Sequence, residues 1–283
     1  MTAFRDKSLT IALAIVCAMA TTQDARPMNA APGMDTVSHL QDFPVIEFRR
    51  YTTAAGQRKN FVSFFDAYFP EAFEQLGAIV FGQFLERDHP NGFTWLRGYK
   101  DMSARPIVCS AFYYGPLWKE HKAKVNAILP DSDNVMLLRP LRPDTAIGVL
   151  PAVDPVAEPN GAGGIVVAQI FPLKKGAEAD FARRAEPEFK HYGIDGVHAA
   201  GILVSLDAAN NFPQLPIRTD GPWLVWLGIV ENETVLHRLQ AALQQTGQTL
   251  AGSGQLNGVA EVIVMDPTPR SRMRWTMVNS APR

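Results

Sequence analysis

Two short segments of the sequence carry charged and aromatic side chains at every second position. They are Glu47, Arg49 and Tyr51 within residues 45–51, and Trp95, Arg97 and Tyr99 within residues 93–99. Alternate side chains of a β-strand share one face of a sheet. Arginine pairs with carboxylates in a bidentate fashion and stacks on aromatic rings. The two sets could therefore hold a flat ligand with polar edges, or they could form a buried ion-pair network with a structural role.

Histidine titrates near neutral pH, so a histidine in a pocket would be a candidate for proton transfer. His198 begins a predicted strand and is the best placed of the six histidines, and Tyr51 is the other candidate for handling protons. No two histidines have the spacing of metal ligands on one helix. The sequence also contains no phosphate-binding loop and no nucleophile elbow. We therefore expect no metal and no cofactor.

The elements that would position these residues occur twice in the chain. The first copy has the patterns of strands at 45–51, 79–87, 93–99 and 134–139, and of helices at 57–76 and 115–128. The second copy has strand patterns at 165–171, 197–206, 222–230 and 259–265, and helix patterns at 177–192 and 232–246. The turn glycines Gly56 and Gly176 follow the first strands at a constant offset. Matches in the same order along both copies indicate an internal repeat.

Each copy has the element order β-α-β-β-α-β. The predicted fold class is α+β, with two tandem ferredoxin-like modules (44–140 and 165–266) forming an intramolecular pseudo-dimeric barrel. A sheet with helices on one face needs a partner for its other apolar face. Phe48 and Leu96 alternate with the charged residues and suit packing beneath helices, so we expect the charged set to face the barrel interior. Residues 141–164, rich in proline and glycine, are predicted as a linker.

The first copy resembles the NIPSNAP family. The first strand of that family reads approximately tyrosine-glutamate-leucine-arginine-x-tyrosine and leads to a turn glycine. The residues that match this strand and turn are Glu47, Phe48, Arg49, Tyr51 and Gly56. A later motif of the family is matched by Leu96, Tyr99 and Arg105, with Arg97 in place of a tryptophan. Trp118 matches the tryptophan ahead of the last helix. The resemblance covers residues 45–140 well and 165–270 weakly. It implies a dimeric α+β barrel whose wider superfamily includes cofactor-independent monooxygenases, dehydratases and isomerases, and it adds Trp118 to the candidate ligand residues.

The N-terminus has the features of a cleavable export signal. Arg5 and Lys7 precede an apolar run that ends at Ala20, which predicts a signal peptide at 1–20 followed by an extended arm at 21–43. We expect a periplasmic or secreted protein, or a cytoplasmic one if this segment is not a signal. Removal of the segment leaves Cys109 as the only cysteine, which excludes an intramolecular disulfide and suggests a buried structural thiol. Residues 267–283 are predicted as a C-terminal tail.

Composition narrows the classes of function. The 283 residues are 47% hydrophobic and carry a formal net charge of −1, so the chain is globular without a basic surplus for nucleic acid. It has no stretch of the ~20 apolar residues that span a membrane. Two functions remain open. One is a barrel that binds a small organic molecule, with monooxygenase-like or isomerase-like activity as a candidate. The other is an interaction or scaffold protein whose buried charges are structural. Homo-oligomerisation is compatible with both.

Overall fold

The computed structural model describes residues 43–276. The predicted export signal, nearly all of the predicted N-terminal arm and the last seven residues of the predicted tail lie outside the described residues. Within the described part, no helix is long and apolar enough to cross a membrane.

Eight antiparallel strands form a closed barrel in the order β1-β3-β2-β8-β5-β7-β6-β4. The strands are β1 (Val45–Thr52), β2 (Ala78–Glu86), β3 (Gly92–Tyr99), β4 (Asp131–Pro140), β5 (Ile165–Pro172), β6 (Val197–Ser205), β7 (Trp223–Val230) and β8 (Glu261–Pro267). Closure leaves no sheet edge unpaired. The predicted mixed α+β fold with a barrel formed within one chain is therefore confirmed.

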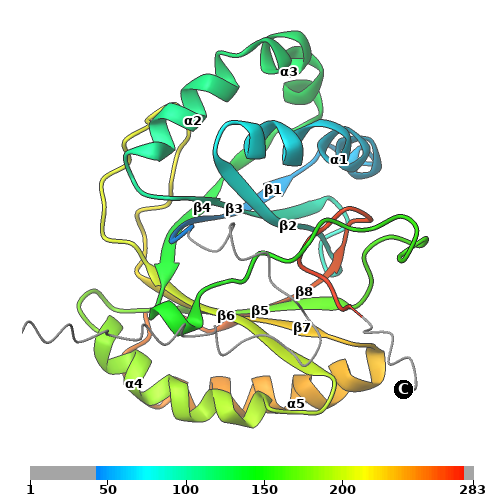
Figure 1. The fold of residues 1–283 in the computed structure, drawn as a ribbon. Helices are drawn as coiled ribbons and strands as arrows, with labels where there is room; N and C mark the ends of the chain where they lie inside the picture. The colour runs from blue at the N-terminus through cyan, green and yellow to red at the C-terminus, as the bar shows by residue number, and fades with distance from the viewer. Residues whose placement is uncertain (1–42, 277–283) are drawn as a thin grey trace, which may run out of the picture.

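Helices cover the outside of the barrel in two layers (Figure 1). The first half of the molecule comprises β1–β4 with α1 (Arg58–Gln75), α2 (Ala104–Tyr113) and α3 (Pro116–Ile128); the second half comprises β5–β8 with α4 (Glu178–Phe189) and α5 (Glu233–Ala251). Short 3-10 turns lie at Pro143–Thr145 and Lys190–Tyr192. Pro70 lies inside α1 without ending it. Helix α2 was not predicted from the sequence.

The two halves have equivalent strand pairing. The first half is ordered β2-β3-β1-β4 and the second β6-β7-β5-β8. The register shifts at the same place in β2, between Val80 and Gly82, and in β6, between Ala199 and Gly201. The two strand pairs that join the halves are also equivalent. Strand β2 pairs with β8 through residues 84–86 and 265–267, and β4 pairs with β6 through residues 138–140 and 203–205. The barrel therefore has an approximate two-fold axis that relates its halves.

Most of the barrel interior is apolar. One buried cluster takes residues from all eight strands and from no helix, and Phe48, Leu96, Ala168 and Leu227 are among its members. Two other clusters combine alternate residues of one half's strands with that half's own helices. The first cluster is the filling of the barrel, and the other two are the layers between sheet and helices.

Segments outside the repeated elements also pack on the barrel. Ile147, Val149 and Leu150 of the predicted linker join the interior cluster. Residues 268–276 of the predicted tail run along β2, where the backbone amides of Thr268 and Met273 donate to carbonyls of β2. Both segments are therefore part of the folded unit.

Candidate functional site

The charged residues of β1 and β3 lie beneath the helices of the first half. Phe48 and Leu96 belong to the interior cluster, whereas Tyr51, Trp95 and Tyr99 belong to the cluster that contains α1, α2 and α3. The prediction that the charged set faces the barrel interior is therefore wrong. Strand alternation separates the two sets of side chains, but it does not determine which face of a doubly buried sheet the helices cover.

Glu47 is the centre of a fully buried ion-pair network. Its Oε2 accepts hydrogen bonds from Arg49 Nη1 at 2.9 Å and from Arg97 Nε at 3.0 Å. Its Oε1 accepts one from Arg105 Nε at 2.7 Å. Arg49 Nε also donates to Tyr51 Oη at 2.8 Å. Each of the three guanidinium groups is thereby fixed in orientation by the same carboxylate.

The network keeps its groups ionised despite burial. Burial alone would raise the pKa of Glu47, but the adjacent Arg97, Arg49 and Arg105 outweigh this effect and hold the pKa well below its usual range. Burial alone would lower the pKa of Arg49, but Tyr51 and Glu47 raise it overall. A buried charge is stable only where partners compensate for the lost hydration. Glu47 and Arg49 therefore stay charged across the physiological pH range.

The network holds more positive than negative charge. Three arginines pair with the single carboxylate of Glu47, which leaves an excess of two positive charges. Among the described residues, Arg97 Nη1, Arg105 Nη2 and Trp95 Nε1 are buried without a hydrogen-bond partner. The nearby phenols do not supply negative charge, because burial raises the pKa of Tyr113 to about 12 and that of Tyr99 well above its usual value. This region therefore favours an additional anion.

A cleft of about 430 Å³ opens beside the network, and we call it the first-half cleft. Arg49 and Tyr51 line it from the sheet, and Phe212 lines it from the loop between β6 and β7 of the second half. Its other aromatic and cationic lining residues are Phe61, Phe69, Tyr113, Tyr114, Trp118, Lys119 and Lys122, and its neutral polar ones are Asn126, Ser132 and Gln214. All the charged side chains that line it are positive. Arg49, only 1% exposed, is therefore the link between the cleft and the buried network.

The second half has a cleft of about 730 Å³ between α5 and β8, which we call the second-half cleft. Gln169 lines it and occupies the β5 position that corresponds to Arg49 in β1. Its Nε2 donates to the Leu243 carbonyl at 3.0 Å, and its Oε1 accepts from Tyr192. Of the described residues lining this cleft, Asp88 alone is charged. The approximate two-fold axis thus relates a cationic cleft to one without a cation.

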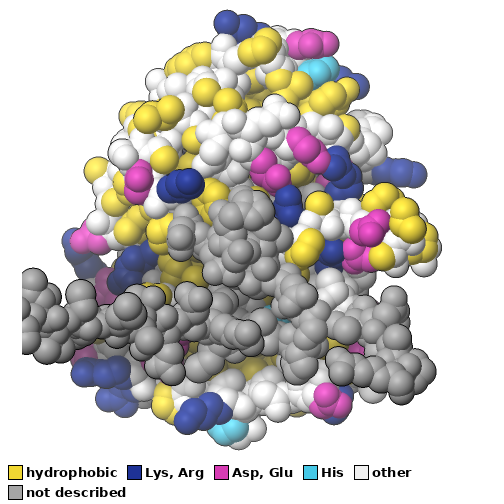
Figure 2. Space-filling view, viewed as in Figure 1, with side chains coloured by type: hydrophobic (Ala, Val, Ile, Leu, Met, Phe, Trp, Pro, Cys, Tyr) yellow, Lys and Arg dark blue, Asp and Glu magenta, His cyan; other side chains and the backbone are white. Residues whose placement is uncertain are grey.

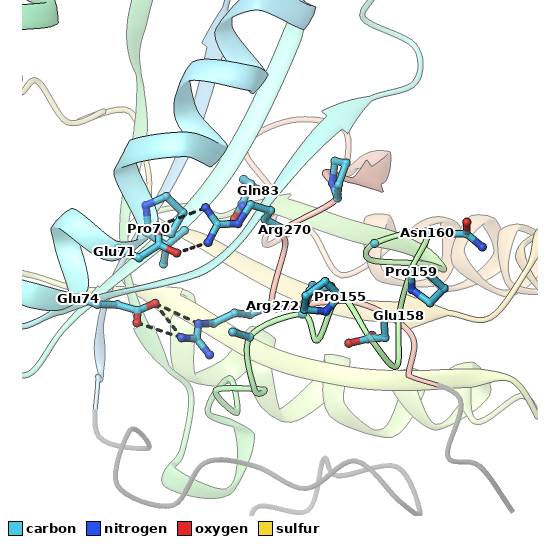
Figure 3. A pocket seen from close by; sticks show the side chains of 15 residues that line it. Pro70, Glu71, Glu74, Gln83, Pro155, Glu158, Pro159, Asn160, Arg270 and Arg272 are labelled. Atoms are coloured by element: carbon cyan, nitrogen blue, oxygen red, sulfur yellow. Dashed lines mark hydrogen bonds and ion pairs between the residues drawn. The ribbon is translucent and has the colours of Figure 1, made fainter.

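A third cavity, of about 440 Å³, lies between α1, the linker and the C-terminal segment (Figure 3). Its arginines are already paired with carboxylates. Arg270 pairs with Glu71, and Arg272 Nη2 lies 2.9 Å from Glu74 Oε1. These pairs attach residues 270–272 to α1, and they leave no cation free for a ligand. Of the three cavities, the first-half cleft has the strongest electrostatic preference for an anion.

The sequence-predicted site residues fall into three groups. Arg49, Tyr51 and Trp118 line the first-half cleft. The second group, Glu47, Trp95, Arg97 and Tyr99, lies behind the cleft, and each of these residues is no more than 1% exposed. Cys109, predicted as a structural thiol, is buried beside this group, with its Sγ 3.2 Å from Tyr99 Oη. The third group is His198 alone. The site residues that the sequence did not single out are Arg105, which was noted only as a family match, Phe212 and the two lysines of α3.

His198 lies away from the first-half cleft. It is half-buried in β6, and its cross-strand partner is Ile229, a member of the interior cluster. Directly paired residues of antiparallel strands share a face, so His198 is on the interior face of the sheet. Burial lowers the pKa of His198 from its ordinary value of 6.5 to about 4. The structure therefore does not bring this candidate together with Arg49 or Tyr51.

The lowered pKa of His198 predicts an acid-sensitive contribution to stability. The folded state favours the neutral imidazole, so the unfolded state takes up a proton at higher pH. Stability is full above pH 6.5 and is lost as the pH falls from 6.5 toward about 4. Between pH 7 and pH 5 the free energy of unfolding should therefore fall by about 1–2 kcal/mol less in His198→Gln than in wild type. Urea unfolding at both pH values measures this, with exposed His237→Gln as the control; equal losses in both variants would refute it.

Other features of the described residues limit the kinds of site. Among residues 43–276, no group of three or more His, Cys, Asp or Glu side chains is arranged to hold a metal ion. On the face shown in Figure 2, acidic and basic side chains are interspersed, and neither sign forms a continuous patch. The first-half cleft is therefore the strongest candidate functional site.

Comparisons with known proteins identify the fold. No protein-family model and no curated protein matches the sequence. The solved structure of an anthrone oxidase-like protein is similar, with a TM-score of 0.51 and 12% identity over 83% of this chain and 98% of that chain. A mutant chlorite dismutase from Candidatus Nitrospira defluvii gives a TM-score of 0.48 and 11% identity, over 82% of this chain and 95% of that chain. A NIPSNAP domain protein from Burkholderia xenovorans gives 0.30 and 20% identity, over 34% of this chain and 93% of that chain.

The chain thus has the fold of the dimeric α+β barrel proteins, with both halves of the barrel in one polypeptide. At 12% identity this similarity concerns the fold alone. The function has to be argued from the site.

Proposed function

We propose that the protein binds a small organic anion with an aromatic or apolar body in its first-half cleft. The observation that carries the proposal is the unbalanced charge: three buried arginines share one carboxylate, and one of them, Arg49, lines a cleft whose other charged residues are lysines. A carboxylate, phenolate or enolate next to Arg49 would reduce this imbalance. Electrostatic interactions are stronger in such a site than in water because the surroundings are poorly polarisable.

The walls of the cleft favour a flat, apolar ligand body. Tyr113 and Trp118 pack edge to face, with ring centroids 5.1 Å apart, and the ring of Tyr113 lies 6.3 Å from that of Phe212. Aromatic side chains bury large apolar areas and accept the face or edge of another ring. The volume of about 430 Å³ lies within the range of small-molecule sites. The ligand class is therefore an aromatic or similarly flat organic acid.

An enzymatic role is proposed as an extension of binding. One similar structure is named an anthrone oxidase-like protein, and the NIPSNAP resemblance suggests cofactor-independent oxygenase or isomerase chemistry. Such reactions pass through a substrate oxyanion, which Arg49 and the hydroxyl group of Tyr51 would stabilise. The described lining residues include no carboxylate or imidazole to remove a proton. Tyr51 is accordingly the candidate for proton transfer, and His198 is not.

The alternative is an interaction or scaffold role. The observation that favours it is that the same charges join the halves, since Arg105 contacts both Glu47 and the β6–β7 loop. A purely structural network predicts that removing Arg49 destabilises the fold and that no ligand of the first-half cleft exists.

We also propose that the halves are tandem ferredoxin-like modules related to the NIPSNAP family, and that the protein is exported. The matching strand order, register shifts and strand pairs between the halves support duplication. The basic and apolar pattern of residues 1–20 supports export. Mass spectrometry of the protein from its native host tests export, because a mature N-terminus near residue 21 is expected and an intact N-terminus would contradict it.

A matched ligand panel tests binding. Isothermal titration calorimetry of the full chain with benzoate, salicylate and 1-naphthoate is compared with titration of the neutral benzamide and 1-naphthamide. We expect at least one acid to bind and its amide to bind at least about tenfold more weakly, because the amide lacks the charge that pairs with Arg49. Equal affinity of acids and amides, or binding of none, would contradict the proposal.

The lysines of the first-half cleft predict a salt-dependent contribution to affinity. Lys119 and Lys122 are exposed on α3, so their attraction for an anion acts through solvent and is screened by salt. We expect the double change to glutamine to weaken 1-naphthoate binding about threefold at low ionic strength and hardly at all at 0.5 M salt. Exposed Lys175→Gln in the second half is the control, and a salt-independent loss would contradict this role.

A further inference from the structure

The loop between β6 and β7, residues 206–222, is much longer than the equivalent loop of the first half. The corresponding β2–β3 connection has five residues, 87–91, whereas this one has seventeen. Figure 1 shows it in yellow, running from the second half to α2 of the first half. An extension of this length that crosses to the other half needs a reason beyond joining two neighbouring strands.

The loop docks on the first half through its backbone and one aromatic anchor. Its two ends join β4, where the amides of Leu206 and Arg218 donate to carbonyls of that strand at 3.0 and 2.8 Å. Between these ends, Phe212 is 5% exposed and belongs to the buried cluster of the first half. Phe212, Gln214 and Leu215 line the first-half cleft. One wall of the cleft is therefore supplied by the other half of the molecule.

Arg105 connects this wall to the charge network. Its Nη1 donates to Asn210 Oδ1 at 2.9 Å and to Asn211 Oδ1 at 3.0 Å, and its Nε donates to Glu47 Oε1 at 2.7 Å. The other oxygen of Glu47 holds Arg49. A single fully buried guanidinium thus reaches the loop on one side and the carboxylate that orients the ligand-facing arginine on the other. A lysine, with one ammonium group, cannot make both sets of contacts.

We infer that Arg105 is a positioning residue that couples docking of residues 206–222 to anion binding at Arg49. The inference rests on the proposed function. With the loop docked, Arg105 is held by the two asparagines and fixes Glu47, and Phe212 forms one wall of the cleft that Arg49 lines. With the loop undocked, Arg105 and Arg49 gain water, and their attraction for an anion weakens. Coupling of this kind is reciprocal, so an anion in the first-half cleft also stabilises the docked loop.

Hydrogen exchange on the ligand-free full chain tests the docking step. We compare wild type, Arg105→Lys and the double variant Asn210→Ala/Asn211→Ala. The double variant keeps all buried charges and removes the asparagine side-chain bonds, which join the loop to Arg105 and to the Met102 carbonyl and also brace the loop itself at Phe212 and Leu215. Exposed Asn257→Ala is the control. We expect amide exchange in residues 207–217 to rise about tenfold or more in both test variants, as loss of hydrogen bonds to a charged group implies. Exchange in β7 should stay unchanged, which shows that the barrel is intact. Unchanged exchange in 207–217 would overturn the inference.

Ligand binding tests the coupling step separately. 1-Naphthoate is expected to slow exchange in 207–217 of wild type and to dissociate about tenfold faster from the double asparagine variant, measured by stopped-flow fluorescence. If 1-naphthoate binds wild type without slowing exchange in the loop, and binds the double asparagine variant equally tightly, the coupling is overturned. The proposed function still stands in that case. If wild type binds no acid of the panel, the proposed function and the coupling fail together, and only the docking result remains.

Discussion

Glu47→Gln is expected to lower the free energy of unfolding by about 4 kcal/mol or more, because breaking a buried ion pair costs about 3–5 kcal/mol. The substitution preserves shape and removes the only carboxylate that contacts Arg49, Arg97 and Arg105 in the described structure. Three guanidinium ions would then remain buried without a counter-charge. Urea denaturation at pH 7 measures the change.

Glu261→Gln is the matched control for this prediction. Glu261 also pairs with an arginine, Arg50, at 2.9 Å, but its carboxylate is 50% exposed. Exposed pairs contribute less than about 1 kcal/mol. The pKa of Glu47 lies below its unfolded value, so its contribution is present above about pH 4.5 and decreases as the pH falls further. A cost for Glu47→Gln similar to that of the control would show that the network is not central to the fold.

Arg49→Gln is expected to weaken binding of 1-naphthoate by about 100-fold, since a hydrogen bond to a charged group contributes about 1.5–3 kcal/mol in a buried site. The same change should cost little stability, because Glu47 keeps Arg97 and Arg105 as partners and the excess positive charge decreases by one. Calorimetric titration and urea denaturation of the same preparations separate the two effects.

The scaffold alternative predicts the opposite pattern for Arg49→Gln. A structural role would lower stability by a few kcal/mol, as expected when a buried pair is broken, and wild type would show no binding of 1-naphthoate in the first-half cleft. Exposed Arg183→Gln, on α4 of the second half, is the control for general loss of positive charge. Loss of stability in Arg49→Gln, with no binding of 1-naphthoate to wild type, would therefore favour the scaffold over the binding protein.

Much of the fold could be predicted from residue patterns. The predicted strand at 45–51 is observed at 45–52, and the predicted helix at 57–76 at 58–75. The turn glycines Gly56 and Gly176 have φ angles of 72° and 82°, which non-glycine residues rarely adopt. The equivalent register shifts in β2 and β6 agree with the repeat seen in the sequence. These features are local or repeated, so the sequence alone specifies them.

The site could be predicted only in part. The sequence brought Glu47 and Arg49 together correctly, because they alternate on one strand, but it placed them on the wrong side of the sheet. Arg105 lies in α2, a short helix with a proline in its first turn, and no periodic pattern marked it as a site residue. Phe212 comes from an irregular loop of the other half. Its role depends on tertiary contacts that no local pattern encodes.

A structure of the full chain with 4-bromobenzoate tests the central claim most directly, since the anomalous signal of bromine locates the ligand without ambiguity. We predict a carboxylate within hydrogen-bond distance of the Arg49 guanidinium and the bromine among the aromatic walls, with the second-half cleft, which no cation lines, empty. Bromine signal in the barrel interior, or equal occupancy of both clefts, would contradict the claim that the uncompensated arginines make the first-half cleft an anion site.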